Sequence, residues 1–71
     1  MSILTGQEAK DTLDELLKHS TPFPEPYVVG YYFDIYTGIW TGFDNRTGDC
    51  WVESFKSDFE VRRWVHGKDN N

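Results

Sequence analysis

The sequence has little cysteine, because Cys50 is the only one among 71 residues. A single thiol excludes an intramolecular disulfide and any metal site that is built from several cysteines. Since small secreted domains commonly depend on disulfides, the lone cysteine favours a reducing compartment and predicts a cytoplasmic protein. The two histidines, His19 and His66, lack the short ligand spacing of zinc sites, so we expect no metal and no other cofactor.

Long hydrophobic runs are also absent. The longest, over residues 27–33, is interrupted by Gly30 and is far shorter than the roughly 20 residues that span a bilayer. The first residues have neither the basic start nor the apolar centre of a secretion signal. We therefore expect no membrane association.

Positive charge is scarce. Seven Lys and Arg stand against twelve Asp and Glu, which gives a formal net charge of −5 at pH 7. Basic surface supplies most of the affinity for a phosphate backbone, so this balance argues against general nucleic-acid binding. The negative charge is compatible with solubility alone or with a basic protein partner.

Aromatic residues are abundant and make up 17% of the chain. Each buried Phe, Tyr or Trp removes roughly 150–250 Å² from water, which allows so short a chain to close one core. We expect a single small domain over residues 1–71. Three stretches rich in β-branched and aromatic residues are predicted to form the strands of an antiparallel meander: 27–36, 39–44 and 49–55.

The turns of this meander predict its register. Residues 37 and 38 favour a tight turn, and residues 45–48 favour a second one. With both hairpins symmetric, Gly42 lies opposite Trp51, and Phe43 lies on the other face of the sheet. A bulge in the first turn would move part of the first strand to the other face. Residues 45–47 also match a glycosylation acceptor, which means little without secretion.

One helix is predicted before the meander and one after it. The first, over residues 6–19, begins at the capping-box spacing of Thr5 and Glu8 and ends before a stiff proline-rich connector at 21–26. The second, over residues 58–66, begins at the same spacing in Ser57 and Glu60, with Gly67 as its C-terminal cap and 68–71 as a frayed tail. The order helix, three strands, helix predicts an α+β two-layer sandwich.

A two-layer sandwich leaves one face of the sheet without a helix. If the face with Trp51 is the core, the other face exposes an apolar patch, which is typical of a protein interface. Its residues are Tyr32, Tyr36, Ile39, Phe43 and Val52. In the opposing interpretation, the second helix or the connector covers that face. The first strand would also be an open edge, so either the face or the edge could form a homodimer.

Three acidic residues, Glu8, Asp11 and Glu15, fall on one side of the first helix. A solvated helix face is the simpler interpretation, and a surface for a basic partner is the functional one. We therefore predict a small acidic protein-binding module of the inhibitor, immunity or phage-accessory type. The alternative is a single-strand nucleic-acid binder that stacks bases on the aromatic sheet, helped by Arg46, Arg62 and Arg63.

Catalysis would need an activated nucleophile. Cys50 could be combined with either histidine, but no nucleophile signature surrounds it. A free cysteine on a strand more often packs as a small apolar residue, here facing Phe43. We expect that the protein is not an enzyme.

Overall fold

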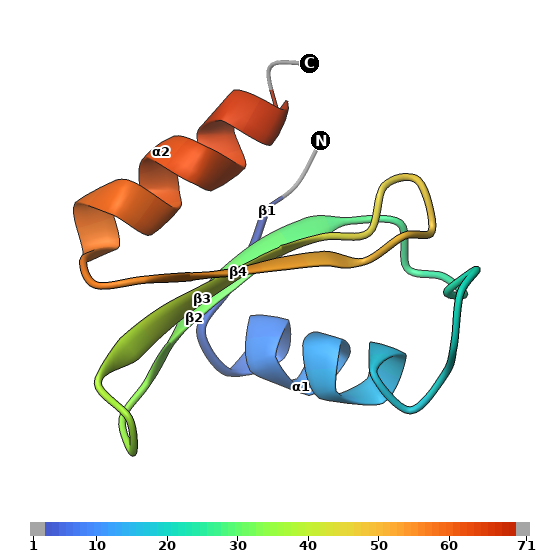
Figure 1. Ribbon diagram of the computed structural model, residues 1–71, viewed down its shortest axis with the longest axis horizontal. Coiled ribbons are helices and arrows are strands. Elements are labelled where there is room, and N and C mark those ends of the chain that lie inside the picture. Colours follow the sequence, from blue (N-terminus) through green and yellow to red (C-terminus); the bar gives the residue numbers. More distant parts are fainter. Residues whose placement is uncertain (1–2, 70–71) are drawn as a thin grey trace.

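The computed structural model describes residues 3–69 and contains four strands and two helices (Figure 1). In chain order these are β1 (Ile3–Thr5), α1 (Gly6–Leu16), β2 (Val29–Asp34), β3 (Ile39–Asp44), β4 (Trp51–Phe55) and α2 (Asp58–Asp69). The α+β class is confirmed. The predicted order is wrong, because a strand precedes the first helix. Within residues 3–69, neither helix is long and apolar enough to cross a membrane.

The extra strand changes the edges of the sheet. The strand order is β1-β2-β3-β4, with β1 parallel to β2 and the other pairs antiparallel. Since β1 pairs with Val29–Tyr31, the strand predicted at 27–36 is not an open edge along this part. Three residues are too few to show strand periodicity, and their partners lie far along the chain. The edges are instead β1 and β4.

Both hairpins have longer loops than predicted. In the first, Asp34 pairs with Ile39, because the Asp34 carboxylate accepts the backbone N–H groups of Tyr36 and Thr37 and so begins the turn early. In the second, Asp44 pairs with Trp51, so Gly42 lies opposite Glu53 and not opposite Trp51. Each register therefore differs from the predicted one by two residues. A shift of two keeps every side chain on its predicted face.

The two helices lie on opposite sides of the sheet (Figure 1), so the fold has three layers and the predicted two-layer arrangement is wrong. On the side that we call the α1 face, Ala9, Leu13 and Leu16 of α1 pack with Phe43 in the main core. On the α2 face, Val61 and Trp64 lie against Gly42 of β3, and Trp64 also contacts Phe55 at 5.7 Å between ring centroids. Large apolar residues on both faces are explained by a helix on each.

Two glycines make room for aromatic rings. A Cβ atom added to Gly30 would lie 2.7 Å from the ring of Phe43 on the α1 face. A Cβ atom added to Gly42 would lie 2.9 Å from the indole of Trp64 on the α2 face. Both contacts are closer than ordinary van der Waals distance. Glycine therefore lets each ring sit directly on the strand backbone.

The helix ends differ from the predicted ones. Thr5 makes no side-chain cap bond, and α1 ends at Leu16, before the predicted residue 19. At α2, Ser57 Oγ accepts the backbone N–H of Glu60, as a capping box requires, while the Glu60 carboxylate reaches back to the N–H of Lys56. Gly67 lies inside α2 and is not its cap. The predicted frayed tail overlaps α2 at residues 68 and 69, and residues 70–71 lie outside the described part.

Candidate protein-binding surfaces

The apolar patch predicted on the α1 face is not open. Phe43 has 0% exposure and belongs to the core beneath α1, so its side chain cannot contact a partner. Tyr32 is half-buried against the same core, and Ile39 is half-buried at the start of β3. Tyr36 and Val52 are exposed, but Tyr36 lies in the β2–β3 turn and Val52 in β4. The five residues therefore do not form one surface, because α1 covers Phe43 at their centre and the two exposed residues lie in separate segments.

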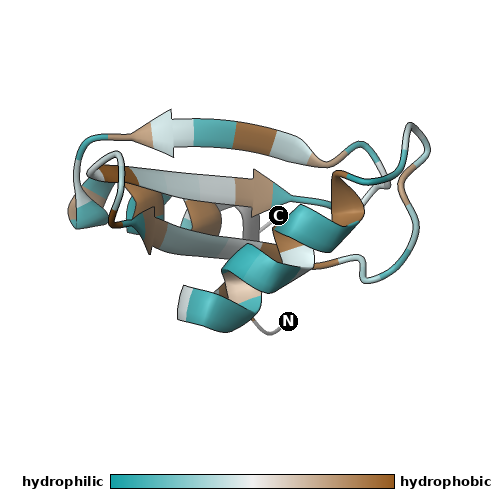
Figure 2. Ribbon diagram, turned by 90° about the horizontal axis from the view of Figure 1, so that it is seen from below, coloured by the Kyte–Doolittle hydropathy of each residue, from teal (hydrophilic) through white to brown (hydrophobic). Residues whose placement is uncertain are grey.

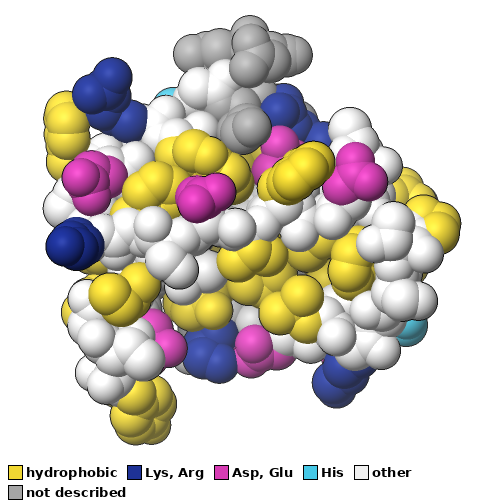
Figure 3. All heavy atoms as spheres, viewed as in Figure 1, with side chains coloured by type: hydrophobic (Ala, Val, Ile, Leu, Met, Phe, Trp, Pro, Cys, Tyr) yellow, Lys and Arg dark blue, Asp and Glu magenta, His cyan; other side chains and the backbone are white. Residues whose placement is uncertain are grey.

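The largest apolar exposure in the sheet is at its β4 edge, which we define as Trp51–Phe55. Trp51 is 62% exposed and points to the α2 face, while Val52 is exposed on the α1 face. Glu53 and Ser54 are also exposed, and Phe55 is half-buried. Figure 3 looks onto this edge and shows hydrophobic side chains gathered along the layer between the two helices. The interpretation in which the face with Trp51 is the core therefore does not hold for Trp51 itself, which lies at the open edge of the sheet.

The position of the helices explains why this edge is open. α1 lies over β1 and β2, and α2 lies mainly over β2 and β3. Seen from the α1 side (Figure 2), β4 is the uppermost strand and lies apart from that helix. Within the described residues, β4 pairs only with β3, so its outer backbone groups have no neighbouring strand. The β4 edge therefore combines free strand hydrogen-bonding groups with exposed apolar side chains.

The acidic side of α1 is exposed as predicted, with Glu8, Asp11 and Glu15 in solvent. Part of its charge is balanced by neighbours. Lys18 donates to Glu15 at 3.1 Å, and Lys10 donates to Asp14 at 2.8 Å. The second contact raises the pKa of Lys10 through its hydrogen bond to Asp14 and the attraction of that carboxylate. Such exposed pairs contribute little to stability and exchange readily for other partners.

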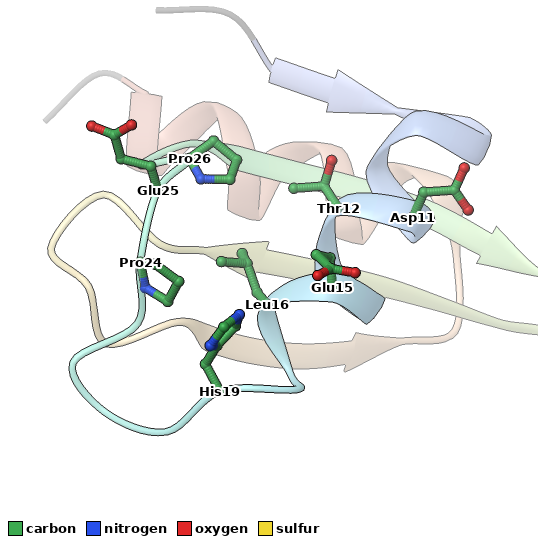
Figure 4. Close-up of a pocket in the computed structure, with 8 residues that line it drawn as sticks. All are labelled: Asp11, Thr12, Glu15, Leu16, His19, Pro24, Glu25 and Pro26. Carbon is green, nitrogen blue, oxygen red and sulfur yellow. The ribbon is translucent and has the colours of Figure 1, made fainter.

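A groove lies between α1 and the proline connector, with a volume of about 270 Å³ (Figure 4). We call it the α1 groove. One wall comes from α1 and the turn that follows it, and the other from the connector. Its lining residues are Asp11, Thr12, Glu15, Leu16, His19, Pro24, Glu25 and Pro26. Two of them, Asp11 and Glu15, were predicted from the sequence as part of an acidic helix face. The groove itself was not predictable, because only tertiary packing brings the connector to the helix.

Asn45 holds the connector in place. Its side-chain Nδ2 donates to the carbonyl oxygens of Pro24 at 3.0 Å and Pro26 at 2.9 Å, and its backbone N–H donates to Val28 at 2.8 Å. Asn45 has 0% exposure. The asparagine of the predicted glycosylation tripeptide is therefore a buried structural residue, and its amide is not accessible for modification in the folded chain.

Cys50 packs in the core, as expected, but it precedes β4 and is not part of the strand. It is 7% exposed and adopts a φ of 51°, a left-handed conformation that turns the chain into β4. Burial, and to a lesser extent the charge of Asp44, raises the pKa of its thiol. Nucleophilic cysteines require a lowered pKa and access to solvent. The environment of Cys50 provides neither.

Two of the three arginines that a nucleic-acid interface would use are paired with carboxylates. Arg46 contacts the nearly buried Asp44 at 3.1 Å, and Arg62 contacts Asp58 at 3.1 Å. Arg63 lies over the ring of Phe59, 5.6 Å from its centroid. The stacking surface itself is covered by α1. The aromatic rings of the α1 face therefore lie beneath a helix, and two of the arginines already have carboxylate partners.

Across residues 3–69 there is no group of three or more His, Cys, Asp or Glu side chains that could hold a metal ion. Neither a protein-family model, nor a curated protein, nor a solved structure matches the chain. The β4 edge and the α1 groove are therefore interpreted from their own shape and chemistry.

Proposed function

We propose that this chain is a small acidic, non-catalytic module that binds another protein chain by adding a strand to the β4 edge. The observation that carries the proposal is the open side of β4, where exposed Trp51 and Val52 flank unpaired strand backbone. Strand addition uses backbone hydrogen bonds for affinity and alternate side-chain contacts for specificity. β4 presents both.

The side chains of the β4 edge favour association over protection. Proteins commonly block exposed edges with Lys, Pro or a bulge, because an open edge pairs with other strands. β4 contains neither Lys nor Pro, and Glu53 is its single charge. Trp51 is exposed, and tryptophan is among the residue types that most often dominate the binding energy of a protein interface.

Small acidic chains that bind without catalysis include inhibitor, immunity and phage-accessory proteins, and we place this module among these types. The partner strand belongs either to another protein or to a second copy of the chain. The single cysteine supports action in a reducing compartment such as the cytoplasm. The buried Cys50 thiol, with its raised pKa, supports a role without covalent catalysis.

The test compares two variants that each replace an exposed aromatic residue with lysine. Trp51→Lys changes the β4 edge, and Phe59→Lys, at a residue that is 68% exposed on α2, is the matched control. Sedimentation velocity first shows whether the wild type self-associates. If it does, Trp51→Lys is expected to be monomeric and Phe59→Lys to behave as wild type, which identifies the partner strand as a second copy.

If the wild type is monomeric, a partner is captured from cytoplasmic extract with the immobilised chain, and the purified complex is studied by amide hydrogen exchange. Strand addition is expected to slow the exchange of outward-facing amides within residues 51–55. The expected binding is retained by Phe59→Lys and lost by Trp51→Lys. A complex that protects other elements while β4 exchanges as in the free chain contradicts the proposal.

A further inference from the structure

The α1 groove has the size and lining of a site for one long cationic side chain. Small-molecule pockets commonly measure about 300–1,000 Å³, and this groove, at about 270 Å³, lies below that range. Leu16, which is 1% exposed, lies at its base, and Pro24 and Pro26 form an apolar wall (Figure 4). We infer that the groove binds a Lys or Arg side chain presented by a basic segment of a protein partner. The inference rests on the proposed protein-binding function and assigns it a second contact surface.

Charge complementarity selects a cation for this groove. Three carboxylates, those of Asp11, Glu15 and Glu25, line it, and the Thr12 hydroxyl adds a further hydrogen-bond acceptor. The net charge of −5 attracts a basic segment from a distance and raises its association rate. The Lys18 ammonium near Glu15 is an exposed partner, which a bound cation can replace at little cost.

The apolar walls select a cation with a hydrocarbon stem. Lys and Arg side chains place their methylene groups against apolar surface while the charged end stays among polar groups. The exposed Pro24 and Pro26 offer that surface, and the buried Leu16 lies beneath it. Figure 4 shows the acidic side chains spaced along the groove, with Asp11 and Glu25 at its two ends. A bare metal ion would gain nothing from the proline wall. Along residues 3–69, moreover, no cluster of three metal-ligating side chains is formed.

The groove is also held in shape before anything binds. The two hydrogen bonds from Asn45 fix the carbonyls of Pro24 and Pro26, and the N–H of Phe23 donates to the Gly48 carbonyl at 2.7 Å. Proline further restricts the backbone of this segment. A preformed wall loses little conformational entropy on binding, which increases affinity for a given set of contacts.

The experiment titrates the ¹⁵N-labelled chain with a capped octapeptide of alternating Arg and Ser, followed by two-dimensional NMR. The matched neutral probe replaces each Arg with citrulline, which has the same shape without the charge. The Arg peptide is expected to shift amide signals of α1 and the connector around the groove, and the citrulline peptide to leave them unchanged. Equal binding of both peptides overturns the inference.

Two matched variants separate the groove from general charge attraction. Asp11→Asn removes one groove carboxylate, and Asp49→Asn removes one exposed carboxylate in the β3–β4 loop; each side chain accepts a hydrogen bond that Asn can still accept. Asp11→Asn is expected to weaken the Arg peptide by about 1.4- to 5-fold, and the double variant Asp11→Asn/Glu15→Gln by the product of two such factors. Asp49→Asn is expected to bind as wild type. Equal losses in Asp11→Asn and Asp49→Asn contradict a specific site.

The competing occupant is a second copy of the chain, which would place the exposed Arg63 of its α2 in the groove. In that case the same groove signals would shift as the protein concentration rises without peptide, and Arg63→Gln would abolish the shift. This result overturns the assignment to a separate basic partner. The titration uses no strand partner, so its failure leaves the β4 proposal standing. Conversely, if the β4 amides are not protected from hydrogen exchange in a complex, the β4 proposal fails, while binding of the Arg peptide to the groove is unaffected.

Discussion

Replacing Gly30 with alanine tests the packing of the core with one methyl group. The added Cβ atom would lie 2.7 and 2.8 Å from two ring atoms of Phe43, and 3.1 Å from the carbonyl oxygen of Leu4. Ordinary contact begins at 3.4 Å, so the ring must retreat by at least about 0.7 Å. Phe43 is fully buried beneath α1 in the core cluster, and protein cores are close-packed, so the ring moves only by displacing its neighbours.

The expected cost follows from two opposing terms. Overpacking a close-packed core costs about 1–3 kcal/mol, while alanine in a strand recovers about 0.5–1 kcal/mol because the unfolded chain loses less conformational freedom. The central values of the two ranges leave a net loss of about 1 kcal/mol in the free energy of unfolding, and the largest loss is about 2.5 kcal/mol. With a urea dependence of about 1 kcal/mol per molar for a chain this small, the unfolding midpoint is expected to fall by about 1 M.

Urea unfolding followed by tryptophan fluorescence measures this shift. Gly67→Ala is the control, since a Cβ atom there meets nothing within 4 Å, and alanine inside α2 should raise stability by up to about 0.5–1 kcal/mol. The double variant Gly30→Ala/Phe43→Leu should lose less than the sum of its single variants, because the smaller side chain leaves room for the methyl group. A midpoint of Gly30→Ala at or above that of the wild type refutes the contact.

Three further predictions concern single side chains. Phe43→Ala should destabilise the chain by about 3–5 kcal/mol in urea unfolding, since it empties a fully buried site, whereas Tyr36→Ala at 89% exposure should change stability by less than about 0.5 kcal/mol; equal effects would show that Phe43 is not core. Asn45→Asp should lower the free energy of unfolding by at least about 1–3 kcal/mol in the same assay, because it sets a carboxylate against two carbonyl oxygens that accept N–H groups from Asn45 in the wild type. A midpoint equal to that of the wild type would mean that these hydrogen bonds do not form. Burial raises the pKa of Cys50, so the unfolded chain loses this proton first, and stability should fall as pH rises above the ordinary value of 9.0. In unfolding midpoints measured from pH 7 to 10, Cys50→Ala should therefore show a smaller loss of stability at alkaline pH than the wild type. An equal loss in both would contradict the contribution of Cys50.

The face on which each strand residue lies was predictable from the sequence. Gly30, Tyr32 and Phe43 share one face, and Tyr31 and Gly42 share the other, as the alternation indicated. The prediction survived an error of two residues in both registers, because side-chain direction repeats with that period. Loop lengths were not predictable from turn residues alone, since the Asp34 carboxylate captures two backbone N–H groups and ends β2 early.

Two features of the candidate sites depended on contacts between distant segments. β1 has three residues and pairs with a strand beyond α1, so no local pattern marks it. The α1 groove needs the connector to return against α1, and this position is held by Asn45, which lies in the loop after β3. In the sequence, that asparagine looks like an ordinary turn residue.

Local patterns in the sequence determined the helices, the three main strands and the direction of their side chains, because these depend on backbone geometry within a few residues. The tertiary structure alone decided which apolar surfaces are covered. With a helix on each side of the sheet, Phe43 becomes core, while Trp51 stays 62% exposed at an edge that neither helix reaches far enough to cover. Burial is a property of two surfaces together, and the second surface is supplied by a segment that lies elsewhere in the chain.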